Sequence, residues 1–188
     1  MGTKSSVHNK MNNHSDAHSR RPPSPWIARF AGAIEPGGRV LDLACGSGRH
    51  SIFLLRLGHA VTACDIDVST VADLGGEAGM EITAADLEND AWPFAERRFA
   101  AVVVTNYLHR PLFPHILAAL APGGLLLYET FAAGNERFGR PRNPAHLLKR
   151  GELLSGILAG LTIIAYEDLT IGEPESAAVQ RVCARKPA

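Results

Sequence analysis

Three aspartates in the first half of the chain have the residue type and the spacing of a ligand-binding site. Asp42 lies inside an apolar run that begins at Val40, while Asp65 and Asp86 close the next two apolar runs. A carboxylate can accept one hydrogen bond from each hydroxyl of a vicinal diol, or it can pair with a cation. Because burying an unpaired carboxylate costs on the order of several kcal/mol, Asp42 needs a partner. That partner is either a cationic ligand or the N–H groups of a nearby loop.

A glycine turn directly follows the first aspartate. Gly46 and Gly48 allow the backbone to turn sharply and to pass close to a bound molecule, where a Cβ atom would collide. A helical pattern starts at about Ser47, so free N–H groups face a ligand at this junction. A nicotinamide oxidoreductase is an alternative, but its G-x-G-x-x-G pattern ends here in Ser51.

The elements that must position these residues alternate between short apolar runs and helical patterns. This alternation predicts a doubly wound, mostly parallel α/β sheet, in which the carboxyl ends of the strands face one crevice. We expect strands at 40–43, 60–67, 81–86, 99–105, 125–131, 161–168 and 177–183, and helices that start near residues 24, 47, 69 and 111 or cover 149–160. The segment 122–124, Pro-Gly-Gly, is expected to end the helix that starts near 111. The last two strands should form a terminal antiparallel hairpin.

The stretch from Asp42 to Gly48, Asp-Leu-Ala-Cys-Gly-Ser-Gly, resembles the first motif of class I S-adenosylmethionine (SAM) dependent methyltransferases. One departure is Ala44, where that motif often has its first glycine. The resemblance runs from about residue 36 to the C-terminus and implies a Rossmann-like fold with a C-terminal hairpin, with SAM as the cofactor. The cofactor-binding residues that it implies, together with the turn, are Asp42, Ala44, Cys45, Gly46, Gly48, Asp65, Ile66, Asp86, Leu87 and Asn106.

The resemblance also divides the cofactor among the strand ends. Asp65 would accept hydrogen bonds from the ribose hydroxyls, and its position 23 residues after Asp42 (65 − 42) fits a Rossmann-like unit. Asp86 would accept from the adenine amino group, next to the backbone N–H of Leu87. An alternative use of the second acid is to cap a helix near residue 69, a role that we expect for Asp67 instead.

Candidates for the acceptor side follow the fourth strand and fill the long connection 132–150. The catalytic candidates are Tyr107 and His109, since an imidazole near neutral pH can serve as a general base. The substrate-binding candidates are Arg110, Glu129, Arg137, Arg140 and Arg142. The connection 132–150 is basic and irregular, and we interpret it as a substrate-side lid whose arginines can bind an anion through paired hydrogen bonds.

The acceptor is expected to be a small molecule. Methyl transfer from a sulfonium needs no metal, and none is expected. The stretch 149–154 is loosely similar to small tellurite-resistance-type methyltransferases, which implies a soft acceptor such as a thiol or a chalcogen oxyanion. A SAM-binding protein without catalysis is a further alternative.

Composition excludes several other classes of protein. Nineteen basic and nineteen acidic residues give no net charge, which argues against a nucleic-acid partner. The sequence after Asn106 also lacks the Pro-Pro-aromatic continuation of amino-group DNA methyltransferases. No apolar run approaches the ~20 residues of a membrane span. Three scattered cysteines are too few for a disulfide framework, and without a secretory signal we expect a cytoplasmic protein.

We expect two parts in the chain. Residues 1–23 are polar and have little to bury, so they should form a disordered tail. Residues 24–188 should form one SAM-dependent methyltransferase domain, because a length of this order supports a single core. The sequence leaves open whether the protein is a monomer or a homodimer.

Overall fold

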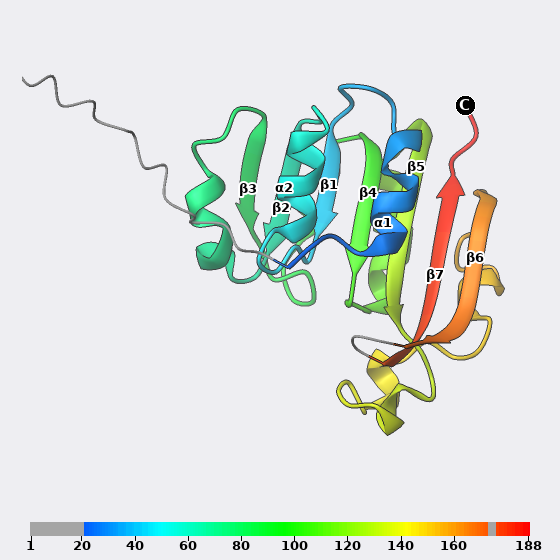
Figure 1. The fold of residues 1–188 in the computed structure, drawn as a ribbon. Coiled ribbons are helices and arrows are strands. Elements are labelled where there is room, and N and C mark those ends of the chain that lie inside the picture. The colour runs from blue at the N-terminus through cyan, green and yellow to red at the C-terminus, as the bar shows by residue number, and fades with distance from the viewer. Residues whose placement is uncertain (1–20, 173–175) are drawn as a thin grey trace, which may run out of the picture.

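The computed structural model describes residues 21–172 and 176–188, and the expected disordered tail 1–23 lies outside these ranges except for its last three residues. The centre of the fold is a seven-stranded sheet in the order β3-β2-β1-β4-β5-β7-β6 (Figure 1). The first five strands pair in parallel, whereas β7 runs antiparallel to both β5 and β6. The predicted doubly wound sheet with a terminal hairpin is therefore confirmed.

The bounds of the elements follow the apolar runs closely. The strands are β1 (Val40–Leu43), β2 (Val61–Asp65), β3 (Met80–Ala84), β4 (Phe99–Thr105), β5 (Leu120–Phe131), β6 (Thr162–Ile171) and β7 (Ala177–Arg185). The α-helices are α1 (Pro25–Phe30), α2 (Arg49–Arg56) and α3 (Phe113–Ala119). Short 3₁₀ helices are η1 (Ala31–Ala33), η2 (Val68–Leu74), η3 (Arg110–Leu112), η4 (Asn135–Arg137), η5 (Pro144–His146) and η6 (Glu152–Leu154).

Two apolar layers cover the two faces of the sheet. On one face, α1 and α2 pack against β1 through residues such as Trp26, Leu54 and Val40 (Figure 1). On the other face, α3 packs against the alternate positions of the same strand, Leu41 and Leu43. Since both faces are covered, the central strands need near-continuous apolar sequence, as β4 shows.

Three predictions about the helices differ from the structure. The segment 149–160 forms only η6 and turns, because Gly151, Gly156 and Gly160 all adopt left-handed φ angles of 68°, 99° and 87° that interrupt a helix. The helix near residue 69 is the 3₁₀ helix η2. The residues 122–124 do not end α3 but lie within the bounds of β5, where the pairing with β4 shifts register between Phe99 and Ala101.

Candidate cofactor site

A cavity of about 350 Å³ opens where β1, β2, β3 and β4 end. Its walls come from four separate strand ends and consist of Ala44, Asp65, Ile66, Ala85, Asp86, Leu87, Glu88, Asn89 and Tyr107. Parallel strands place their carboxyl ends at one edge of the sheet, so residues far apart in sequence meet there. The predicted acids at the ends of β2 and β3 therefore face the same space.

Asp65 connects the end of β2 to the glycine turn. The backbone N–H of Gly46 donates to Oδ2 of Asp65 at 2.8 Å, and the N–H of Asp67 donates to Oδ1 at 3.2 Å. Each carboxylate oxygen keeps a further lone pair, which suits the two hydroxyls of a ribose. Asp67 caps η2 by accepting from the N–H of Ser69 at 3.0 Å, as the sequence predicted.

Asp86 shapes the loop that follows β3. Its carboxylate accepts from the side-chain amide of Asn89 at 2.9 Å and from the N–H of Glu88 at 3.0 Å. The hydrogen bond from Asn89 is the largest cause of a lowered pKa for Asp86, so this acid stays an acceptor. Ile66 is 68% exposed at the opposite wall and, with Leu87, offers apolar surface for a flat ring.

The glycine turn contains an alanine in a conformation that favours glycine. Ala44 has a φ of 53°, the same value as Gly46. Asn106 at the end of β4 has a φ of 56°, and these are the two non-glycine residues with positive φ in the described ranges. Both follow the carboxyl ends of the neighbouring strands β1 and β4. Strained backbone of this kind is concentrated at functional sites.

Replacing Ala44 by glycine should therefore stabilise the fold. The left-handed conformation costs an L-residue about 1–2 kcal/mol, and the added flexibility of glycine offsets part of that gain. We expect the free energy of unfolding of Ala44→Gly to rise by up to about 1 kcal/mol. Urea unfolding followed by circular dichroism measures this change. A variant less stable than wild type would show that Ala44 is not strained.

Asp42 is placed differently from the acids of β2 and β3. Its side chain is 1% exposed, is absent from the cavity walls and accepts from the Ser51 hydroxyl at 2.6 Å. Burial raises its pKa from the usual 3.8 to about 7, although Ser51 opposes this shift. Asp42 therefore has a partner within the chain, on the first turn of α2, and the predicted contact with a cationic cofactor stays a prediction.

The raised pKa of Asp42 predicts a pH-dependent stability. The folded protein holds this proton more tightly than the unfolded chain, so the associated stability is present below pH 3.8 and is lost as the pH rises through about 7. Asp42→Asn cannot ionise and keeps an acceptor for Ser51. As the pH rises from 4 to 7, the free energy of unfolding of the variant should increase by at least about 1 kcal/mol relative to that of wild type. Urea unfolding at several pH values tests this, and parallel profiles would contradict it.

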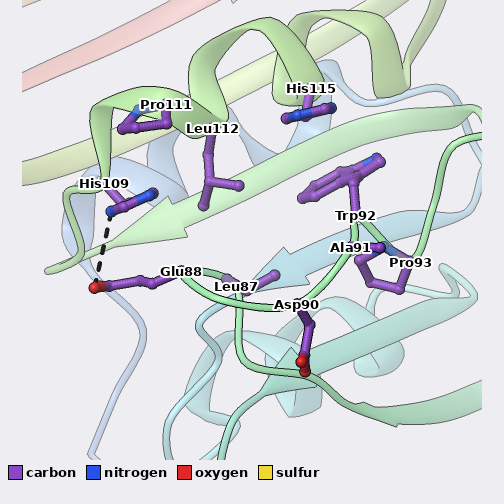
Figure 2. Close-up of a pocket in the computed structure, with 10 residues that line it drawn as sticks. All are labelled: Leu87, Glu88, Asp90, Ala91, Trp92, Pro93, His109, Pro111, Leu112 and His115. Atoms are coloured by element: carbon purple, nitrogen blue, oxygen red, sulfur yellow. Dashed lines mark ion pairs between the residues drawn. The ribbon is translucent and has the colours of Figure 1, made fainter.

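The two predicted catalytic residues lie in different cavities. Tyr107 lines the cofactor cavity, and its hydroxyl donates to Oε1 of Glu88 at 3.4 Å. His109 lines a neighbouring cavity of about 160 Å³, whose walls also include Leu87 and Glu88 (Figure 2). Its Nδ1 lies 3.8 Å from Oε2 of Glu88. Glu88 thus contacts both Tyr107 and His109. This residue was not among the predicted site residues, and its only signal in the sequence is the concentration of acidic residues at 86–90.

Two of the five predicted substrate contacts form ion pairs within the chain, and Arg137 and Arg142 donate to the nearby carbonyls of Gly134 and Gly139. Arg110 is held by Glu152, and Glu129 accepts from the Ser24 hydroxyl at 2.7 Å and from Arg181 at 3.2 Å. The structure thus uses both side chains internally. The other three candidates, Arg137, Arg140 and Arg142, are exposed along the connection 132–150.

A buried polar network that the sequence did not reveal ties α1 to the end of β4. Nε2 of His50 accepts from the N–H of Ser24 at 3.1 Å, and Nδ1 lies 3.4 Å from the hydroxyl of Thr105. Burial lowers the pKa of His50 to about 3, so the imidazole is neutral. Its contacts join three distant segments and could be found only once the fold was known.

Other chemistry is limited in the part of the chain that is described. The thiol of Cys45 is buried in the turn, and this burial raises its pKa, which keeps it protonated. No group of three or more metal-binding side chains occurs among residues 21–172 and 176–188. The helices in these ranges are all too short or too polar to cross a membrane.

The central segment of the chain matches known proteins. Residues 40–124 match a family of methyltransferase domains. The Bacillus subtilis protein YqeM, which carries a provisional methyltransferase name, is 27% identical over 61% of this chain and 51% of its own length. The ribosomal protein L11 methyltransferase of Nitrosomonas europaea is 32% identical over 54% of this chain and 36% of that protein. The chain thus spans about half or less of these relatives.

Solved structures share the whole fold. TehB from Haemophilus influenzae superposes with a TM-score of 0.69 at 19% identity, over 85% of this chain and 61% of that one. An S-adenosylmethionine dependent methyltransferase from Mesorhizobium loti superposes with a TM-score of 0.65 at 19% identity, over 87% of this chain and 99% of that one. The predicted fold is therefore confirmed, and the match of residues 40–124 to methyltransferase domains agrees with the family that the motif at Asp42–Gly48 predicted.

Proposed function

We propose that this chain, a class I SAM-dependent methyltransferase by its fold and by the family match of residues 40–124, transfers a methyl group from SAM to a small-molecule acceptor. The observation that carries this proposal is the cavity in which Asp65, Asp86 and Tyr107 meet at the strand ends. We place the ribose on Asp65, the adenine between Ile66 and Leu87 beside Asp86, and the methionyl part at the turn 44–48 next to Asn106.

The residues of the site fit such a cofactor. The glycine turn is open at Gly46, where no protein atom lies within 4 Å of an ideal Cβ position. The walls contain three carboxylates and no lysine or arginine, which favours a ligand with positive charge. The bound cofactor supplies a methyl group on a positively charged sulfur. The chain's own task is to bind it, to orient the acceptor and to exclude water.

Positioning is the main catalytic effect that we assign to the protein. Holding an acceptor atom and a methyl carbon about 3 Å apart and in line can supply roughly 7–11 kcal/mol of the barrier. Tyr107 forms the wall of the cavity at the end of β4 and would pack against the reacting groups. His109 would serve as a base only for an acceptor that is protonated at neutral pH, through a path past Glu88.

We propose a soft, anionic acceptor, such as a thiolate or a chalcogen oxyanion. The exposed arginines 137, 140 and 142 support an anion, because a guanidinium binds one through paired hydrogen bonds. We also propose a cytoplasmic location and no nucleic-acid partner, in keeping with the balanced charge of the chain.

The test is an assay for release of S-adenosylhomocysteine (SAH), the demethylated product. Purified full-length protein and SAM are incubated with thiols, selenite, tellurite, carboxylates, amines and, as a macromolecular comparison, bacterial ribosomal protein extracts. We expect SAH release that depends on a thiol or an oxyanion. Turnover on the protein extract alone would replace the small acceptor by a protein. Tight SAM binding without any turnover would favour a binding protein, and reduction of NAD(P) would favour the oxidoreductase.

A further inference from the structure

The connection between β5 and β6, which the sequence predicted to be a lid, is attached to other elements by many hydrogen bonds. We call residues 132–154 the crossing segment; it hangs below the carboxyl end of β5 in Figure 1. Its regular structure is limited to short 3₁₀ helices and an isolated parallel bridge between Ala132 and Leu148, so its shape depends largely on contacts with other elements. Its contacts therefore show what holds it in place.

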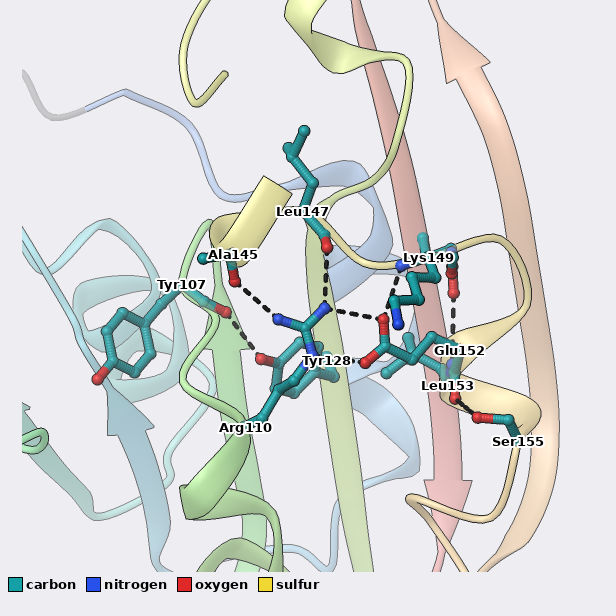
Figure 3. A network of polar contacts seen from close by, with 10 residues as sticks. Tyr107, Arg110, Tyr128, Ala145, Leu147, Lys149, Glu152, Leu153 and Ser155 are labelled. Atoms are coloured by element: carbon teal, nitrogen blue, oxygen red, sulfur yellow. Dashed lines mark hydrogen bonds and ion pairs between the residues drawn. The ribbon is translucent and has the colours of Figure 1, made fainter. Parts of the chain in front are cut away.

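Arg110, at the end of the loop that follows β4, is one anchor of the crossing segment (Figure 3). Its Nε and Nη2 donate to the two carboxylate oxygens of Glu152 at 2.6 and 2.9 Å. Its Nη1 and Nη2 also donate to the carbonyls of Ala145 and Leu147 at 2.7 and 2.9 Å. Glu152 in turn accepts from the N–H of Lys149 at 2.6 Å. One guanidinium thus fixes both ends of the stretch 145–152.

Two buried amides complete the attachment from the side of β7. Gln180 is fully buried and donates to the carbonyl of Lys149 at 2.6 Å. Asn135, 1% exposed, donates to the carbonyl of Pro141 at 3.3 Å and accepts from the N–H of Ala178. Buried polar groups with satisfied hydrogen bonds favour a single conformation. The crossing segment is therefore held in a single conformation.

The same loop forms part of the cofactor cavity. Tyr107, three residues before Arg110, lines that cavity, and its carbonyl accepts from the hydroxyl of Tyr128 at 2.7 Å (Figure 3). The loop 106–110 therefore contacts the cavity at one end and the crossing segment at the other. A molecule that packs on Tyr107 would therefore restrain the backbone of the loop from which the Arg110 side chain extends.

We propose that Arg110 is a positioning residue that fixes the crossing segment relative to the cofactor cavity and transmits occupancy of the cavity to it. Arg110 contacts neither cofactor nor acceptor in this account. In this proposal Arg110 holds the crossing segment, which carries Arg137, Arg140 and Arg142, instead of contacting the substrate itself. The inference rests on the proposed function in one respect: the test uses SAH as the molecule that fills the cavity.

Hydrogen–deuterium exchange of the full chain, with and without saturating SAH, tests this proposal. The variants are Arg110→Gln, Arg110→Lys and Glu152→Gln, with Arg39→Gln as the control because Arg39 forms an exposed ion pair with Glu81. In wild type, SAH should slow exchange several-fold in peptides 63–70 and in peptides 143–154. Arg110→Gln and Glu152→Gln should exchange at least tenfold faster at 143–154, and there SAH should have no effect although it still protects 63–70.

The outcomes separate the two proposals. Absence of any SAH protection in wild type rejects the cofactor site itself. Protection of 143–154 by the same factor in wild type and in Arg110→Gln rejects the coupling, since a residue that only stabilises the segment leaves that ratio unchanged. Arg110→Lys, which keeps one charged donor, should be intermediate and carries the test if the glutamine variant fails to fold. Arg39→Gln should match wild type.

Discussion

Replacing Gly46 by alanine is expected to abolish measurable SAM binding while the protein still folds. Gly46 has a φ of 53°, and Ala44 holds an alanine at that same angle, so the conformation alone does not require glycine. No protein atom lies within 4 Å of an added Cβ. The cost to folding should therefore be limited to about 1–2 kcal/mol of backbone strain. What the glycine leaves free is space for a ligand, and we expect affinity to fall at least ~100-fold.

Gly48 is the matched control, because glycine is required there for the opposite reason. An added Cβ would lie 2.7 Å from Cγ1 of Val71 and 3.2 Å from Cδ1 of Leu74. Gly48→Ala should lose about 2 kcal/mol or more of stability through overpacking and strain. Thermal unfolding and calorimetric titration with SAM separate the two effects. Undiminished SAM affinity in Gly46→Ala would show that the turn does not approach the cofactor.

Removal of the Asp65 carboxylate should give the second large loss. Asp65→Ala deletes the acceptor for the ribose hydroxyls and also releases the N–H of Gly46, which it now holds at 2.8 Å. Losing hydrogen bonds to a charged group costs about 1–3 kcal/mol, so SAM affinity should fall roughly 10- to 100-fold. Isothermal titration calorimetry at constant salt measures this.

Asp67 provides the comparison for that measurement. It lies two residues further on, carries the same charge and caps η2 outside the cavity walls. Asp67→Ala should change SAM affinity by less than about twofold while lowering stability through the lost cap. Equal losses of SAM affinity in Asp65→Ala and Asp67→Ala would mean that negative charge near the cavity attracts the cofactor and that Asp65 does not bind the ribose.

Much of the fold was predictable because the local sequence of its strands favours the same structure as their packing in the sheet does. Residues 99–104 are apolar throughout and rich in valine, which favours a buried strand, and β4 does lie at the centre of the sheet. Asp65 and Asp86 were identifiable because parallel topology brings strand ends together whatever the intervening sequence is. The start of α1 near residue 24 was also predictable, and the structure shows that Ser24 caps it by accepting from the N–H of Trp26.

The errors arose where tertiary contacts decide. The stretch 149–160 has helical spacing of apolar residues, but its glycines adopt left-handed angles and the segment is held by Arg110 and Gln180. The sequence also did not reveal that Asp42 has a partner in Ser51, nine residues away on α2, and the contact of Asp42 with the cofactor stays a prediction. Pairings such as these depend on side-chain directions that periodicity does not encode.

A crystal structure of the chain grown with SAH tests the central claim most directly. We predict density for the nucleoside in the cavity at the strand ends, with both ribose hydroxyls on Asp65, the adenine between Ile66 and Leu87, and the sulfur beside the turn at Gly46. A cavity that stays empty at millimolar SAH, or a nucleoside bound away from Asp65, would contradict this account.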